Sequence, residues 1–180
     1  GCAVDPPIRT SGISEYSSID ELCVDSSYNW SVRACDGALC SDWTPKRNFT
    51  IQSVISITFI TNTTEFGELR TSTPGDIVSN NTLNGQPGPL VLSIDGNMDV
   101  NVDVQALFDL WTQQPLGTRY FQYADEDSSA WRNFTSSYGN FSDGLVWGST
   151  RQMEIAIEVP LQEPEGDKST IVRAIAESAE

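Results

Sequence analysis

The residues of this chain whose types and spacing could do chemistry are six Asn-x-Ser/Thr tripeptides, or sequons. Their asparagines are Asn29, Asn48, Asn62, Asn80, Asn133 and Asn140. About two sequons are expected by chance in a chain of this kind, so six is an excess. A sequon asparagine accepts an N-linked glycan through its side-chain amide. We therefore predict a secreted glycoprotein with its sequons on exposed turns and outward strand positions. The alternative is chance occurrence in a chain rich in Ser and Thr.

Histidine is absent from all 180 residues. This excludes Ser-His-Asp and Cys-His catalysis and zinc sites with histidine ligands. Paired carboxylates could hydrolyse glycosides, but no recognisable motif marks such a pair. We therefore predict no catalytic residue and no enzyme. A net charge of −15 argues against a nucleic-acid partner, because phosphate binding needs a basic surface.

Two acidic groups could hold a cation. One is a ladder with an acid or amide at every second position, namely Asp95, Asn97, Asp99, Asn101 and Asp103. It departs from a calcium loop of the EF-hand type because Val100 occupies the glycine position, so it predicts the solvent face of a strand. The other group, Asp125–Asp127, predicts a solvated loop. We expect no metal site and no cofactor, and Ca²⁺ is the alternative.

Aromatic residues could form a platform for sugars. The candidates lie between residues 111 and 147: Trp111, Tyr120, Trp131, Tyr138 and Trp147. Core packing is the competing interpretation, because Trp and Tyr are favoured in sheets. We expect Trp147 and Phe121 in the core and Trp131 as the exposed sugar-binding candidate.

The four cysteines all lie in the first 40 residues. Cys35 and Cys40 flank a turn sequence, so a hairpin would place them opposite each other, and Cys2 and Cys23 would form a second disulfide. Disulfides are typical of extracellular proteins. No stretch of the sequence is long and apolar enough to span a membrane, so a leader or an anchor would lie outside this chain.

The elements that must position these residues are β-strands. Residues 51–180 contain alternating apolar runs every 8–12 residues, separated by turn signals, which is the pattern of an antiparallel β-sandwich of the immunoglobulin-like or jelly-roll type. The clearest strands are expected at 55–60, 90–94, 98–104, 121–123, 145–147, 153–159 and 170–176. Asp95-Gly96 predicts a hairpin, and so does the turn at 164–169. Residues 106–111 predict a short helical segment.

Residues 1–50 predict a partial β domain. Tyr28, Trp30, Val32 and Ala34 alternate with polar residues, and a return strand is expected from Cys40 to Trp43. Over residues 20–51 this pattern resembles the last two strands of a fibronectin type III domain. The resemblance implies that Tyr28 is the corner tyrosine and that Trp30 faces the core. Too few residues precede these strands to complete such a domain, so another chain or upstream residues would complete it.

The second part resembles β-sandwich modules of archaeal cell-surface glycoproteins, including S-layer and filament proteins. The matching pieces cover about residues 54–178: Phe66-Gly67-Glu68-Leu69, Pro87-Gly88-Pro89-Leu90, Asp95-Gly96-Asn97-Met98-Asp99-Val100, and Ile157-Glu158-Val159-Pro160 with Glu163-Pro164-Glu165-Gly166. The resemblance implies a fold and an extracellular setting. It carries over no catalytic residue.

These observations predict a structural, N-glycosylated subunit or module of an extracellular assembly at the cell surface, such as a filament, pilus or S-layer. Its partners would be copies of itself or adjacent surface-protein modules, linked by β-strand complementation at the half-built first domain. The alternative is a carbohydrate-binding or adhesion module of a secreted multidomain protein, with glycans as ligands.

Overall fold

The computed structural model describes residues 22–36, 39–71, 78–79, 88–126 and 128–179, and these residues form antiparallel β-structure without any helix. The predicted all-β class is therefore confirmed. The chain separates into two compact units, residues 1–54 and residues 55–180, which are described one at a time.

In the described part of unit 1, two strands form an antiparallel hairpin. β1 (Ser26–Trp30) pairs with β2 (Arg47–Ile51), and Tyr28 lies opposite Phe49. The two rings stack with their centroids 5.6 Å apart, on the face of the hairpin opposite to Asn29 and Asn48. The hairpin therefore has an apolar face and a face that carries two sequon asparagines.

Beyond β1 and β2, serine and threonine hydroxyls replace carbonyl groups in the hairpin ladder. The N–H of Val32 donates to Thr44 Oγ1 at 3.0 Å, and the N–H of Ala34 donates to Ser41 Oγ at 3.1 Å. Regular strand structure consequently ends at Trp30 and resumes at Arg47. The predicted return of the chain from Cys40 is present, since the N–H groups of Ser41 and Thr44 donate to the Ala34 and Val32 carbonyls at 2.8 Å, but the regular strands are shorter than predicted. Near the tip, a disulfide joins Cys35 and Cys40.

Two aromatic residues of this hairpin differ in burial. Tyr28 is buried, and its hydroxyl accepts a hydrogen bond from the N–H of Cys23 at 2.6 Å, five residues upstream. This bond is typical of a tyrosine corner. Trp30, which was predicted to face a core, is 45 % exposed, and the Arg47 guanidinium lies 5.9 Å above its ring. Cys23 is disulfide-bonded, whereas Cys2, its expected partner, lies outside the described residues.

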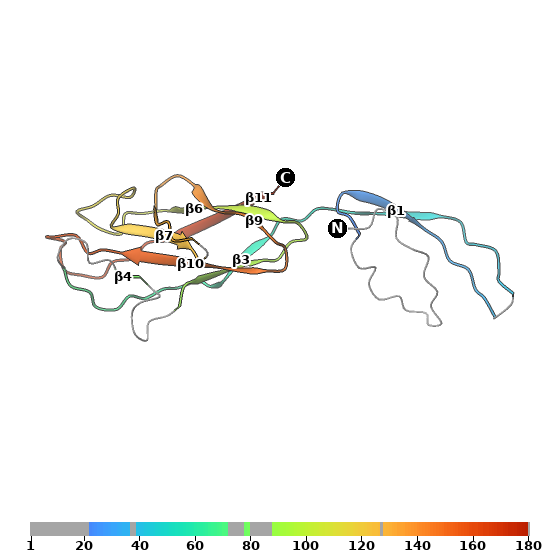
Figure 1. The fold of residues 1–180 in the computed structure, drawn as a ribbon, viewed down its shortest axis with the longest axis horizontal. Coiled ribbons are helices and arrows are strands. Elements are labelled where there is room, and N and C mark those ends of the chain that lie inside the picture. The colour runs from blue at the N-terminus through green and yellow to red at the C-terminus, as the bar shows by residue number, and fades with distance from the viewer. Residues whose placement is uncertain (1–21, 37–38, 72–77, 80–87, 127, 180) are drawn as a thin grey trace. The chain divides into compact units, whose positions relative to one another are not determined.

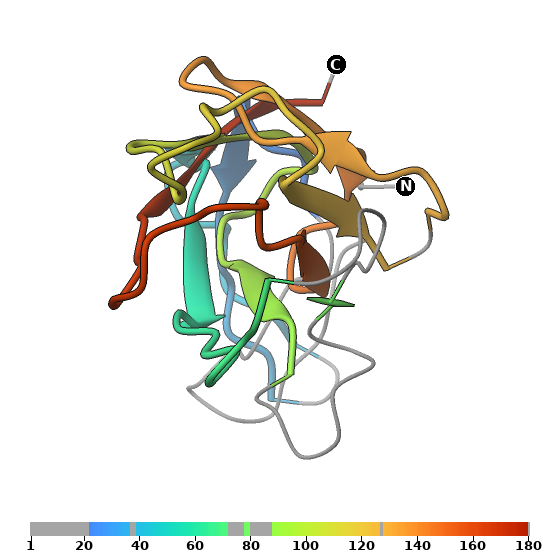
Figure 2. The same ribbon diagram turned by 90° about the vertical axis from the view of Figure 1, so that its left-hand side faces the viewer.

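Unit 2 contains two antiparallel sheets that face each other (Figures 1 and 2). The larger sheet has the order β3 (Ile57–Thr61), β5 (Leu90–Ile94), β10 (Thr150–Ile157), β7 (Phe121–Asp125) and β8 (Arg132–Asn133), and β4 (Val78–Ser79) also pairs with β10. The smaller sheet has the order β11 (Val172–Ser178), β6 (Val100–Ala106) and β9 (Gly139–Leu145).

The core of unit 2 lies between these sheets. Each strand buries alternate residues, because successive side chains point to opposite faces of a sheet. Leu90, Leu92 and Ile94 of β5 face this core, and so do Val100, Val102 and Val104 of β6. Phe134 follows β8 and stacks on Phe121, with the ring centroids 4.3 Å apart. The predicted alternation is therefore confirmed for the central strands.

Two predicted hairpins are instead connections between the sheets. β5 belongs to the larger sheet and β6 to the smaller one, so residues 95–99 cross from one sheet to the other. β5 already has β3 and β10 on its two sides and offers β6 no free edge. The turn at 164–169 likewise joins β10 and β11, which lie in different sheets. Near the first connection, the N–H of Asp95 donates to the Ser56 carbonyl at 2.8 Å, and the N–H of Ala179 donates to the Asp99 carbonyl at 3.0 Å.

The predicted helical segment at 106–111 is also wrong. Ala106 ends β6, and the following residues form bends. Trp111 is buried in the core, and its indole N–H donates to the Tyr120 carbonyl at 2.9 Å. Core packing and this hydrogen bond fix the segment without helical backbone bonds.

A buried carboxylate fastens the β10–β11 connection to the loop that contains Trp111. The side chain of Glu163 is 2 % exposed and lies 2.8 Å from Lys168 Nζ. It also accepts hydrogen bonds from the N–H groups of Thr112 and Gln113 at 2.9 and 3.0 Å. Burial opposes ionisation of Glu163, but these hydrogen bonds outweigh it and lower its pKa from 4.5 to about 2.

We expect Glu163 to make the stability of unit 2 sensitive to acid. Because its pKa is lower in the folded chain, its contribution is present above pH 4.5 and is lost as the pH falls towards about 2. Glu163→Gln should lower the unfolding temperature at neutral pH and flatten its decline in acid. Thermal unfolding between pH 7 and pH 2 measures this, with Glu165→Gln as an exposed control from the same connection. Parallel curves for Glu163→Gln and the natural chain would contradict the prediction.

Candidate functional site

The sequon asparagines of the described residues all lie on the surface. Asn29, Asn48, Asn62, Asn133 and Asn140 are exposed, whereas Asn80 lies outside the described residues. Asn29 and Asn48 are direct cross-strand partners in β1 and β2. Asn62 follows β3, Asn133 ends β8, and Asn140 lies in β9.

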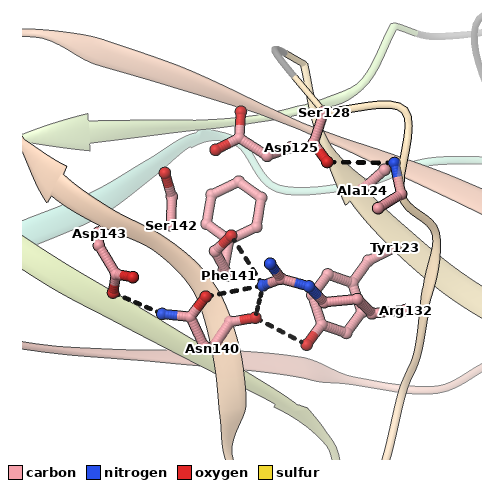
Figure 3. A pocket seen from close by; sticks show the side chains of 10 residues that line it. Tyr123, Ala124, Asp125, Ser128, Arg132, Asn140, Phe141, Ser142 and Asp143 are labelled. Carbon is pink, nitrogen blue, oxygen red and sulfur yellow. Dashed lines mark hydrogen bonds between the residues drawn. The ribbon is translucent and has the colours of Figure 1, made fainter.

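A small hollow of unit 2 lies where β7 and β8 of one sheet approach β9 of the other, and the sequon asparagine Asn140 is among its lining residues (Figure 3). Figure 3 shows this asparagine between Arg132 and Asp143. Its side-chain amide donates to Asp143 Oδ1 at 2.5 Å, and its Oδ1 accepts from Arg132 Nη1 at 2.7 Å. Both ends of the amide are therefore engaged.

Arg132 and Tyr123 close this edge of the sandwich. Arg132 Nη1 donates to the carbonyl oxygens of Asn140 and Phe141, and the Tyr123 hydroxyl donates to the Asn140 carbonyl at 3.0 Å. These bonds satisfy carbonyl groups of β9, which is the edge strand of the smaller sheet among the strands that the structure describes. A Cβ atom at Gly139 would lie 3.2 Å from the Tyr123 hydroxyl, so glycine permits this approach. Burial raises the pKa of Tyr123 above 10, although Arg132 opposes the shift, and the phenol remains a donor at neutral pH.

Tyr123→Phe is expected to lower the free energy of unfolding by about 1 kcal/mol, because it removes one hydrogen bond and leaves the buried ring in place. Chemical denaturation measures the change. Tyr138→Phe, at an exposed position beside β9, is the matched control and should leave stability unchanged. Equal stability of Tyr123→Phe and the natural chain would show that the hydroxyl does not hold this edge together.

The chemistry of this hollow is hydrogen bonding. Its volume is about 150 Å³, below the range of about 300–1,000 Å³ that is usual for ligand pockets. Its two carboxylates, Asp125 and Asp143, are engaged with Arg151 and Asn140. Asp125 was predicted to belong to a solvated loop, but it ends β7, is buried, and lies 2.7 Å from the Arg151 guanidinium. Asp127 lies outside the described residues.

The acidic ladder around β6 binds backbone groups. Asp99 Oδ1 accepts a hydrogen bond from the N–H of Trp147 at 3.0 Å, and Asn101 Oδ1 accepts one from the N–H of Gly144 at 2.9 Å. Asp95 accepts from the Ser93 hydroxyl at 2.5 Å, a bond that lowers its pKa. Within the described ranges, no group of three or more acidic or cysteine side chains is placed to hold a metal ion.

The aromatic residues do not gather into one platform. Trp111 and Phe121 are buried, and Tyr120 and Trp131 are half-buried. Trp147, predicted to lie in the core, is 58 % exposed because β9 ends at Leu145. Tyr138 and Trp147 flank opposite ends of β9, whose seven residues span roughly 20 Å at the usual rise of a strand. Among the described residues, Trp131 is half-buried, and no ring contact joins it to another aromatic candidate.

The fold and the surface define an antiparallel β-sandwich protein with exposed sequons. No family model, curated protein or solved structure matches the chain. Among the residues that the structure describes, no helix is long and apolar enough to cross a membrane.

Proposed function

We propose that this chain is a structural, N-glycosylated module of an extracellular assembly at the cell surface, such as a filament, pilus or S-layer. The observation that carries the proposal is the exposure of sequon asparagines in both units, among them Asn29 in unit 1 and Asn62 in unit 2. An excess of sequons on the surface is what a glycosylated exterior requires.

Three further features support an extracellular setting. A disulfide joins Cys35 and Cys40 in a short hairpin, and such bonds persist in oxidising compartments. The net charge of −15 keeps a crowded surface protein soluble. The bond between Tyr28 and the Cys23 backbone supports the relation of unit 1 to fibronectin type III domains.

The hairpin of unit 1 gives the proposal a mode of assembly. Isolated two-stranded hairpins are marginally stable, and β1 and β2 pair with each other and with no other described strand. A strand supplied by a neighbouring subunit would extend this sheet through main-chain hydrogen bonds. Upstream residues of the same polypeptide are the alternative source of that strand.

Native material tests this function directly. We expect the intact mass of the natural protein to exceed the mass of its polypeptide, and chemical removal of glycans to abolish the excess. Electron microscopy should show periodic filaments or sheets with this chain as the repeat. An unmodified mass together with dispersed single particles would refute the proposal. A sugar-binding module is the second candidate, and glycan binding that is lost in Trp131→Ala would favour it.

A further inference from the structure

We propose that, on the folded chain, Asn29 and Asn62 accept glycans, whereas Asn133 and Asn140 are structural residues that a transferase cannot use. This inference rests on the proposed function, because it requires that the chain meets a glycosyl-transferring enzyme. It separates four sequons that all satisfy the same Asn-x-Ser/Thr pattern.

The transfer reaction makes demands on the whole tripeptide. A bond forms between the asparagine Nδ2 and the anomeric carbon of a sugar on a polyprenyl-diphosphate carrier. The bond from that carbon to the phosphate oxygen breaks, the carrier leaves as its diphosphate, and Nδ2 loses one proton. The asparagine amide must therefore leave its hydrogen bonds. The enzyme must also reach the side chains that follow the asparagine, including the hydroxyl two residues on.

The middle residues of two sequons lie in the core of unit 2. Phe134 follows Asn133 and is 0 % exposed, and Phe141 follows Asn140 and is 2 % exposed. Phe134 contacts the rings of Phe121 and Tyr123, and Phe141 contacts Tyr123. Lifting either tripeptide into an active site would withdraw a phenylalanine from this core.

The amides of the same two sequons are held at both ends. Asn133 Nδ2 donates to the Gly117 carbonyl at 2.9 Å, and its Oδ1 accepts from Gln122 Nε2 at 2.9 Å. Asn140 is held in the same way by Asp143 and Arg132. The hydroxyl of Thr135, which completes the first sequon, donates to the Ser137 carbonyl at 2.6 Å. Both asparagine amides, and the hydroxyl of the Asn133 sequon, are therefore already engaged.

The sequons of Asn29 and Asn62 are different. Their middle residues, Trp30 and Thr63, lie at the surface. The Asn62 Oδ1 accepts a local hydrogen bond from the Thr63 hydroxyl at 3.2 Å, and within the described part of the chain no group holds its amide nitrogen. The Thr64 hydroxyl of this sequon is buried but accepts and donates no hydrogen bond among the described residues, and residues 62–66 follow β3 outside any described strand, so its exposure would break no strand pairing.

Glycan transfer in vitro tests which sequons of the folded chain can be modified. The folded full-length chain and synthetic peptides that cover each sequon are incubated with a purified single-subunit oligosaccharyltransferase and a polyprenyl-diphosphate-linked oligosaccharide. Glycopeptide mass spectrometry then measures the occupancy of each site. Relative to its peptide, modification at Asn133 and Asn140 should fall about ten- to a hundredfold in the folded chain, the range set by exposing a buried phenylalanine. Asn29 and Asn62 should remain close to their peptides.

Two sequon-breaking variants provide matched controls. Ser31→Ala should remove the glycan at Asn29, whereas Ser142→Ala, which keeps Asn140, should leave the glycan mass of the folded chain unchanged. Modification of folded Asn133 or Asn140 at the level of Asn29 and Asn62 would overturn the sorting and leave the proposed function standing. An unmodified mass of the native protein, together with dispersed single particles, would instead refute the proposed function.

Discussion

Phe134→Ala is expected to lower the free energy of unfolding of unit 2 by about 3–5 kcal/mol, the usual cost of deleting a fully buried aromatic ring. The Phe134 side chain lies between the sheets, with its ring centroid 4.3 Å from Phe121 and 4.7 Å from Tyr123. It follows the two-residue strand β8, so few backbone bonds would hold this edge once the ring is gone. Chemical denaturation followed by circular dichroism measures the loss.

The matched control for this prediction is Phe108→Ala. Phe108 is the same residue type in the same unit, but its side chain is largely exposed. Its removal should change stability by less than about 0.5 kcal/mol, as is usual for surface positions. Equal effects of the two substitutions would show that Phe134 does not pack between the sheets as described.

Arg151→Met is expected to cost about 3 kcal/mol of stability, the lower end of the range for breaking a buried ion pair from one side. Arg151 of β10 lies 2.7 Å from Asp125 at the end of the neighbouring strand β7. The side chain of Asp125 is almost fully buried, so its carboxylate would lose the guanidinium in a place that water barely reaches. Equilibrium unfolding in urea at neutral pH measures the change.

The two partners of this ion pair are not equivalent. Asp125→Ala should cost less, because Arg151 remains 3.7 Å from Glu126. The double substitution Asp125→Leu with Arg151→Met should recover most of the loss, since well-packed apolar residues often replace a buried ion pair without cost. A double variant that is less stable than Arg151→Met alone would contradict this account.

The central strands of unit 2 could be predicted from the sequence because their periodicity is local, whereas β8 was not predicted and β9 was expected at 145–147 instead of 139–145. Leu90–Ile94 alternates with a period of two, and the strand lies at the predicted position. Val100, Val102 and Val104 face the core as their spacing indicated. A period of two reports which face a side chain takes, and that information is contained in a few neighbouring residues.

The partner of each strand could not be predicted in the same way. Asp95-Gly96 is a hairpin signal, but whether the chain turns back or crosses to the second sheet depends on β3 and β10, which flank β5. The end of β1 was misplaced because the Ser41 and Thr44 hydroxyls take over bonds that carbonyls usually accept. Hydrogen bonds of this kind join residues that are distant in the sequence, and they do not change the periodic pattern of apolar residues.

The same distinction between local and long-range information applies to the candidate glycosylation sites. A sequon is a local pattern, so each asparagine could be named from three residues. The tripeptides alone do not separate Asn62 from Asn140, because the burial of Phe141 and the bonds of Arg132 arise only when two sheets meet. Alternation in β9 was the one available signal, since it predicts opposite directions for Asn140 and Phe141.

The backbone enters and leaves unit 2 beside one connection, where Ser56 bonds to Asp95 and Ala179 bonds to Asp99. A pulling force applied to the backbone at these two positions would therefore act on the same end of the sandwich. β3 and β11 are edge strands, and each would peel from its one neighbour by breaking hydrogen bonds in succession rather than by shearing them together. If such modules form a lattice under mechanical load, the force would have to be transmitted through contacts between the sides of neighbouring sandwiches and not through β3 and β11.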